Sequence, residues 1–291
     1  MDPPKSPMVY TLIFVAGLSL GNILSSPYFW TGDKLQEKNT SDNNIIYHPY
    51  TTKNENAPSP VDGVTISERS VSSNSSDEML GCIGMKGVGV PTFKTRGELG
   101  AIVQSEGFTR GIELGVQRGY FTRAMLSNWL DCSEYHLVDL WGHQENYSDV
   151  ANLNQNEQEK IYGVAMKTVN PWKEKIHVCR NYTINCVNNY ADEHFDFIYV
   201  DARHDYKGVW EDIVAYWPKL RVGGVMAGHD YVTQNDGPEQ TGQDWTLNYD
   251  GTKDHTSRVV KGAVDDFAAT VCRQVTVSYR EKLWNTWAIR K

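Results

Sequence analysis

The stretch 109–123, TRGIELGVQRGYFTR, constrains the fold of this chain more than any other. A short apolar run ends in Gly115, and Gly119 follows four residues later. This pattern is typical of a buried strand that turns sharply into a helix over a bound small molecule, because glycine can take an unusual φ and let the backbone approach a ligand. A dinucleotide site would need G-x-G-x-x-G, whereas this chain has E-x-G-x-x-x-G. The spacing therefore argues against a nicotinamide-dependent oxidoreductase.

Two residues of this turn, Glu113 and Gly119, have expected roles of their own. Glu113 lies near the carboxyl end of the strand, where its carboxylate can reach a cationic group on a ligand. Gly119 should let the following helix, expected over 120–130, lie near the sheet. A tight strand-to-helix turn without a ligand explains the same glycines equally well, so this turn alone does not decide the function.

The N-terminal part of the chain does not have the pattern of a folded domain. Residues 8–30 contain no charged side chain, and the apolar part is long enough to span a bilayer or to act as a signal peptide. The next segment is rich in Ser, Asn, Thr and Pro, and we expect a disordered stem there. We therefore expect a signal peptide or, preferably, a signal anchor over 1–30, the stem over 31–78, and a folded domain over 79–291.

Either form of the N-terminal segment directs the domain into the secretory lumen, as a single-pass Golgi or endoplasmic-reticulum membrane protein or as a secreted one. The acceptor triplets at Asn39, Asn74, Asn146 and Asn181 agree with that compartment. The five cysteines have no metal-type spacing and could form one or two disulfides, whose pairing cannot be deduced from the sequence. A net charge of −8 argues against a nucleic-acid partner.

The expected domain alternates helical segments with short apolar runs. Thr95 and Glu98 form a capping box for a helix that ends near Glu106, with Gly107 as its stop. Alternating strands and helices with a closing pair of strands predict a doubly wound α/β sheet. Strands are expected over 111–114, 135–139, 175–179, 195–201, 225–227, 273–279 and 284–290, and further helices over 120–130, 152–169, 208–217 and 259–270.

Polar residues follow three of the expected strands. Asp139 ends the second strand, where a carboxylate in a βαβ unit can hold both ribose hydroxyls of a ligand. His204 and His229 follow the fourth and fifth strands and are candidate bases, because imidazole titrates near neutral pH, although each could simply make a structural hydrogen bond. Asp205 either orients His204 or caps the following helix. Asp212 is expected to be a solvated helix residue.

The order of these motifs resembles that of the class I S-adenosylmethionine-dependent methyltransferases. The motifs are E-L-G-x-x-x-G, the acid after the second strand, FDFIYVDARHDY, WPKLRVGGV and GHDY, and they are most similar to a subgroup of sugar and small-molecule O-methyltransferases. The resemblance covers about 82–291 and implies a seven-stranded sheet whose last strand is antiparallel. The residues that it assigns to S-adenosylmethionine are Glu113, Gly115, Gly119, Asp139 and Asp201.

The resemblance also implies a metal site, because some members of the family hold magnesium after strands four and five. The matching residues here are Asp201, His229 and Asp230, a set with two carboxylates and one imidazole, whereas magnesium prefers oxygen ligands. Converging carboxylates would need a cation or an imidazolium between them. Two routes to a deprotonated acceptor therefore stay open: the metal, or His204 or His229 as a base with Asp201 stabilising the imidazolium.

The leading hypothesis is S-adenosylmethionine-dependent methyl transfer to a hydroxyl of a glycan or a small molecule in the secretory lumen. The alternative is a catalytically silent binding protein on the same fold, because the cofactor would have to be transported into the lumen. The intact glycine turn and Asp139 favour the enzyme. Neither the acceptor nor the oligomeric state can be deduced from the sequence.

Overall fold

The computed structural model describes residues 89–291. The expected anchor, the expected stem, the start of the expected domain and the acceptor residues Asn39 and Asn74 lie outside this range. Within 89–291, no helix is both long enough and apolar enough to cross a membrane.

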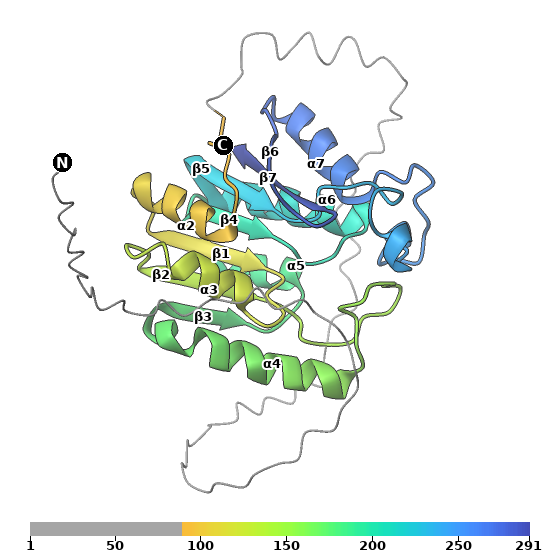
Figure 1. Cartoon of the computed structure of the whole chain (residues 1–291), viewed down its shortest axis with the longest axis horizontal. Helices are drawn as coiled ribbons and strands as arrows, with labels where there is room; N and C mark the ends of the chain where they lie inside the picture. The colour runs from red at the N-terminus through yellow and green to blue at the C-terminus, as the bar shows by residue number, and fades with distance from the viewer. Residues whose placement is uncertain (1–88) are drawn as a thin grey trace, which may run out of the picture. The chain divides into compact units, whose positions relative to one another are not determined.

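One seven-stranded sheet organises the domain (Figure 1). Its strands are β1 (Arg110–Leu114), β2 (Glu134–Val138), β3 (Ile176–Cys179), β4 (Phe195–Val200), β5 (Leu220–Gly228), β6 (Thr276–Glu281) and β7 (Trp284–Arg290). Their order across the sheet is β3-β2-β1-β4-β5-β7-β6. The first five are parallel, and β7 runs antiparallel to both of its neighbours. The predicted doubly wound sheet with an antiparallel last strand is therefore confirmed.

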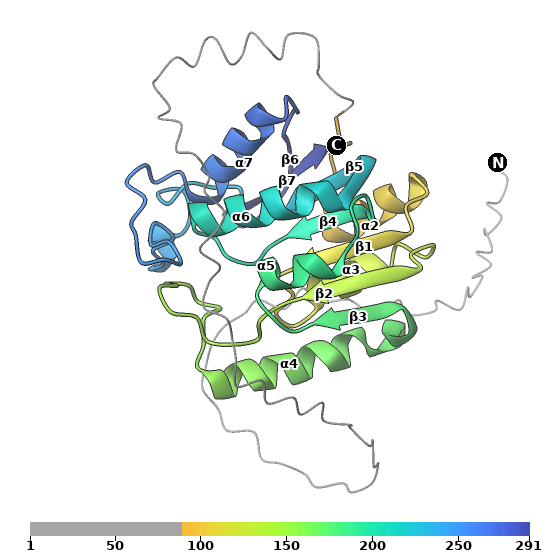
Figure 2. The ribbon, with the colours of Figure 1, turned by 180° about the vertical axis from the view of Figure 1, so that it is seen from behind.

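Helices cover both faces of the sheet (Figures 1 and 2). One face carries α2 (Arg96–Ser105), α3 (Tyr120–Leu126) and α4 (Gln155–Val169), and the other carries α5 (Thr183–Cys186), α6 (Tyr206–Tyr216) and α7 (Val259–Thr270). Each face has its own apolar core. All six residues of β4 are buried, as expected for a central parallel strand that is covered on both sides.

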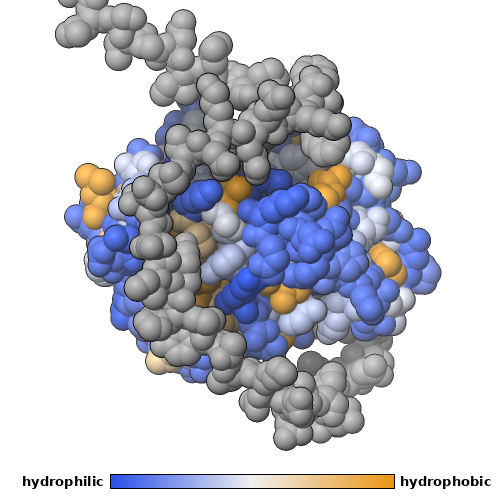
Figure 3. Space-filling view, turned by 90° about the horizontal axis from the view of Figure 1, so that it is seen from below, coloured by the Kyte–Doolittle hydropathy of each residue, from blue (hydrophilic) through white to orange (hydrophobic). Residues whose placement is uncertain are grey.

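The two faces of β4 contribute to different cores because successive side chains of a strand point in opposite directions. Tyr199 belongs to the core under α2, α3 and α4, where its ring stacks on Phe121 with centroids 3.6 Å apart. Val200 belongs to the core under α6 and α7. On the face of the molecule seen in Figure 3, the coloured residues are mostly hydrophilic, and apolar ones form small separate spots.

Several predicted boundaries differ from the structure. The N-cap of the expected capping box is confirmed: Thr95 caps α2 by accepting from the Glu98 N–H, and Gly107 has a left-handed φ of 70°. The Glu98 carboxylate accepts from the N–H of Lys94 rather than from that of Thr95. α3 ends at residue 126 rather than 130. β5 begins at Leu220 instead of 225, because the segment before the expected strand pairs with β4 through an irregular register. A segment that contains Gly223 and Gly224 gives little sign of a strand in the sequence.

The cysteines of this part of the chain are now assigned. Cys179, at the end of β3, forms a disulfide with Cys186 at the end of α5. Cys272 is also disulfide-bonded, and Cys132 is a buried free cysteine. The closed loop between Cys179 and Cys186 fastens α5 to the edge strand of the sheet.

Candidate active site

The carboxyl ends of the parallel strands meet at one edge of the sheet, where the polar motifs gather. The glycine turn follows β1, Asp139 follows β2, Asp201 follows β4, and His229 follows β5. Ligands of open α/β sheets bind at this edge, near the point where the strand order reverses. In this sheet that point is β1, which pairs with both β2 and β4.

Gly115 is required by a close contact inside the protein. It has a φ of 85°, and a Cβ at this position would lie 1.9 Å from the carbonyl oxygen of Asp201. The expected unusual φ is present, and the backbone that approaches so closely is the segment after β4. Gly119 has a φ of 73°, and a Cβ there would lie 3.0 Å from Val169 of α4. The tight contact that Gly119 permits is thus with α4 rather than with the sheet.

Asp139 holds the glycine turn in place. Its Oδ2 accepts hydrogen bonds from the N–H groups of Val116 and Gln117, each at 2.8 Å, and its Oδ1 accepts from the N–H of Trp141 at 2.7 Å. Burial raises the pKa of Asp139, and these hydrogen bonds oppose the shift. A carboxylate has about four lone-pair positions, so room remains for a further donor such as a ribose hydroxyl.

Glu113 does not face the ligand edge as the sequence suggested. Its side chain is 1% exposed and accepts hydrogen bonds from the hydroxyls of Thr122 (2.6 Å) and Tyr135 (3.2 Å). Burial raises its pKa to about 8. The physical reason is strand alternation: Glu113 precedes the last residue of β1, and its side chain points into the core beneath α3. A direct contact with a cationic ligand group is therefore not available in this conformation.

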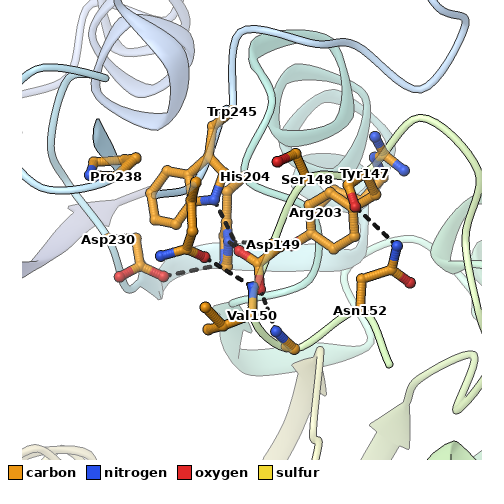
Figure 4. A network of polar contacts seen from close by, with 12 residues as sticks. Tyr147, Ser148, Asp149, Val150, Asn152, Arg203, His204, Asp230, Pro238 and Trp245 are labelled. Carbon is orange, nitrogen blue, oxygen red and sulfur yellow. Dashed lines mark hydrogen bonds and ion pairs between the residues drawn. The ribbon is translucent and has the colours of Figure 1, made fainter. Parts of the chain in front are cut away.

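His204 lies at the centre of a polar network that joins three loops (Figure 4). Its Nδ1 lies 2.9 Å from Oδ2 of Asp149 and 3.1 Å from the hydroxyl of Tyr147. The Tyr147 hydroxyl donates to the carbonyl of Ala202 at 3.2 Å, so it can accept from His204. The indole N–H of Trp245 donates to the same Asp149 oxygen at 2.8 Å. Two acceptors at Nδ1 favour a proton there and leave Nε2 facing the ends of β4 and β5.

Carboxylates surround this imidazole and determine its charge. Nε2 of His204 lies 3.0 Å from Oδ2 of Asp230 and 3.6 Å from Oδ1 of Asp201. Burial alone would lower the pKa of His204, but the surrounding acidic groups hold it well above its ordinary value. Burial would raise the pKa of Asp230, but His229 and His204 hold it well below its usual range. At neutral pH the network therefore contains an imidazolium among carboxylates.

Asp201, His229 and Asp230 form a group that could hold a divalent metal ion. One ligand atom from each lies within 4.8 Å of the others. Nδ1 of His229 lies 3.1 Å from Oδ1 of Asp230, while its buried Nε2 makes no hydrogen bond among the described residues and lies 4.0 Å from Oε2 of Glu281. A buried imidazole that lies close to Asp201 and Asp230 fits a metal ligand set. The imidazole suits Mn²⁺ or Zn²⁺ better than Mg²⁺, which prefers oxygen.

The structure decides between the two expected roles of Asp205 and corrects the expectation for Asp212. Asp205 does not orient His204: it caps α6 by accepting from the Gly208 N–H at 2.8 Å and pairs with Arg203. This was the other of its two expected roles. Asp212 is 4% exposed rather than solvated, and burial raises its pKa to about 7. It points into the core of the α6 face, where α5 covers it.

No motif in the sequence pointed to the residues that orient His204. Tyr147 and Asp149 lie on the connection between β2 and α4, and Trp245 lies on the long connection after β5. Long loops in compact domains are often functional, so the length of a connection was the only sign in the sequence that it could contribute to the site. The 232–258 segment is long enough to act as a lid or to hold an acceptor.

Comparison with known proteins shows what this domain is similar to. Residues 112–231 match the model of a methyltransferase domain family. No curated protein matches the chain. The solved structures with similar folds include an O-methyltransferase from Bacillus cereus in complex with SAH, which is 16% identical, with 78% of this chain and 95% of that chain covered and a TM-score of 0.44.

Two further structures have comparable similarity. A putative caffeoyl-CoA O-methyltransferase from Staphylococcus aureus is 13% identical, with 69% of this chain and 86% of that chain covered and a TM-score of 0.44. The N-methyltransferase NodS from Bradyrhizobium japonicum, in complex with S-adenosyl-L-homocysteine, is 13% identical, with 67% and 85% covered and a TM-score of 0.43. Residues 112–231 are thus similar to a methyltransferase domain family, and they lie within the seven-stranded α/β sheet described above.

Proposed function

We propose that this protein transfers a methyl group from S-adenosylmethionine to a hydroxyl of a small molecule or a glycan. The observation that carries the proposal is the Asp149–His204 pair, whose other imidazole nitrogen, Nε2, faces Asp201 and Asp230 beside the glycine turn. The glycine turn and Asp139 lie at the sheet edge where such folds bind ligands, and they would hold the cofactor.

The reaction asks little of the protein, because the sulfonium already activates the methyl group. The site must align the acceptor oxygen with that methyl and remove the proton of the hydroxyl. Asp201 and Asp230 would position the hydroxyl, and the neutral form of His204 would accept its proton at Nε2. Asp149 and Tyr147 fix the Nδ1 tautomer, as the orienting acid does in other nucleophile–base pairs. Because the pKa of His204 is raised, the fraction of neutral base grows with pH.

A divalent metal ion would add to this site if it were bound. Asp201, His229 and Asp230 would hold it, and it would lower the pKa of the acceptor hydroxyl. Its positive charge would also offset that of the carboxylates around His204, which would lower the pKa of that imidazole. The imidazole in the ligand set favours manganese or zinc over magnesium, which prefers oxygen ligands.

We further propose that the domain works in the secretory lumen, on the lumenal side of a single-pass anchor or as a secreted protein. The uncharged segment 8–30 motivates this proposal, and the Cys179–Cys186 disulfide supports it, because disulfides persist in oxidising compartments. Protease protection of the chain in intact microsomes tests it. Digestion of the whole chain without detergent would exclude the lumenal location.

The test of the activity has a binding arm and a transfer arm. S-adenosylhomocysteine is titrated calorimetrically into the purified chain, and methyl transfer to a panel of glycans and small hydroxylated molecules is followed by mass spectrometry. We expect His204→Gln to bind S-adenosylhomocysteine like the wild type but to lose transfer. His143→Gln, which alters an exposed histidine outside the network, is the matched control. No binding in the wild type would reject the enzyme and favour the silent binding protein.

A further inference from the structure

A second group of metal-ligating side chains lies at the opposite end of the sheet. Glu134 is the first residue of β2, and His194 immediately precedes β4, so both lie at the amino ends of the parallel strands. His136 follows two residues after Glu134 and points to the same face of the sheet. The catalytic network follows the carboxyl ends of the same strands. Because β2 rises about 3.3 Å per residue, the two ends are more than 10 Å apart.

The three side chains converge on a single oxygen atom. Oε1 of Glu134 is in close contact with Nε2 of His136 and lies 3.1 Å from Nε2 of His194. One ligand atom from each residue lies within 4.8 Å of the others. Two imidazoles that approach one carboxylate oxygen in this way need only small side-chain rotations to share an ion.

Aromatic packing fixes the two imidazole rings. The His136 ring makes edge contacts with Tyr190 and Phe195, with centroids 5.0 Å and 5.3 Å away, and stacks on His177 at 4.7 Å. The His194 ring meets Phe195 edge-on at 4.7 Å. Phe195 is fully buried, so its ring gives both imidazoles a rigid support. Ligands held in this way lose little conformational freedom when they bind an ion.

The cluster opens into a hollow that can admit an ion and a further ligand. Its volume is about 250 Å³. All three converging side chains are half-buried, so they are neither sealed in the core nor fully solvated. The residues that line the hollow are Glu134, His136, His177, Val178, Cys179, Asn189, Tyr190, Ala191 and His194.

We propose that Glu134, His136 and His194 form a binding site for a divalent transition-metal ion such as Zn²⁺. Imidazole nitrogens with one carboxylate oxygen suit borderline ions, and Ca²⁺ or Mg²⁺ would require more oxygen ligands. Three protein ligands beside a hollow leave the fourth position for water. The bound ion ties the start of β2 to the segment before β4, across β1, and therefore stabilises the amino edge of the sheet.

Zinc chloride alone is the probe that tests this site. It is titrated calorimetrically into the purified full chain, and the thermal unfolding midpoint is measured with and without zinc. We expect Glu134→Gln and His194→Gln each to lose one bound zinc per chain, or to bind it at least about a hundredfold more weakly, because losing a ligand costs at least as much as losing an outer-shell partner. The zinc-dependent rise in the midpoint should disappear in both variants.

The controls separate this site from the cluster at the other end of the sheet. Asp201→Asn alters that other cluster. This variant should still bind the zinc ion that is lost in Glu134→Gln. His255→Gln removes an exposed histidine outside both groups and should bind zinc like the wild type. Because His194 lies outside the strands, His194→Gln should fold if Glu134→Gln does not. Zinc binding by either folded variant with wild-type stoichiometry and affinity would overturn the proposal, and so would an equal loss in His255→Gln.

Discussion

Replacing Glu113 by glutamine tests whether this residue belongs to the core or to the cofactor site. Burial raises the pKa of the Glu113 carboxyl to about 8 from an ordinary value of 4.5. Between these two pH values the folded protein keeps a proton that the unfolded chain releases. The free energy of unfolding therefore falls by about 1.4 kcal/mol per pH unit as the pH rises through this window.

The structure sets the size of the expected effect. A pH of 7 lies about 2.5 units above the ordinary pKa of the Glu113 carboxyl. At that pH the ionisable side chain therefore lowers the free energy of unfolding by about 3 kcal/mol. Solvent screening does not reduce this figure much, because Glu113 is 1% exposed. A glutamine has nearly the same shape, and its amide oxygen can accept from the hydroxyls of Thr122 and Tyr135. Glu113→Gln should thus match the wild type near pH 4 and become more stable as the pH rises, with the difference levelling above about pH 8.

Chemical denaturation of both proteins at pH values from 4 to 9 measures this difference, with Glu157→Gln as a control. Glu157 pairs with Lys160 on the exposed surface of α4, so its replacement should change stability by less than about 1 kcal/mol at every pH. A Glu113→Gln protein that is less stable than the wild type at pH 8 would refute the reasoning. Calorimetry with S-adenosylhomocysteine adds a second readout. We expect the affinity of Glu113→Gln to be unchanged, and a large loss of affinity would show that Glu113 belongs to the cofactor site.

Three other substitutions test the site. Asp139→Ala should weaken S-adenosylhomocysteine binding tenfold or more in calorimetry, because a charged acceptor is lost; unchanged affinity would remove Asp139 from the cofactor site. Asp205→Ala should lower the free energy of unfolding by about 1–2 kcal/mol in urea titrations, because α6 loses its cap, and no loss would argue against that cap. Asp149→Asn should move the rise of methyl transfer with pH to lower pH, because His204 loses a carboxylate that raises its pKa; an unmoved profile would exclude His204 as the base.

The sheet was predictable because its signals are local. The glycine turn, the buried run of β4 and the alternation of strands with helices each follow from a short stretch of sequence. β5 was predicted too short because its first half contains Gly223 and Gly224, which read as a turn. Pairing with β4, together with the long-range contacts of β7, makes that segment a strand. Such pairing depends on partners that are distant in the sequence.

Burial of single charged residues was harder to predict than the fold. Asp212 lies on a helix next to Glu211, and a charged helix residue is ordinarily exposed. α5 covers this part of α6, and the disulfide from Cys179 to Cys186 helps to hold α5 there. No local pattern in the sequence shows where this short helix will lie. The same limit applies to Glu113, because β1 is buried on both faces and its apolar pattern does not indicate which face a given side chain joins.

The partner of His204 shows most clearly where local reasoning fails. Asp205 is adjacent in the sequence, yet a helix-capping residue turns its side chain toward the first N–H groups of the helix, so it cannot also serve the preceding imidazole. The capping geometry of Asp205 thus requires the orienting acid to come from another loop. Asp149 supplies it from 55 residues earlier in the chain, and Trp245 holds the same carboxylate from the segment after β5. Because both loops contribute to one hydrogen-bond network, a change in the 232–258 segment should alter the proton affinity of His204 as well as the fit of the acceptor.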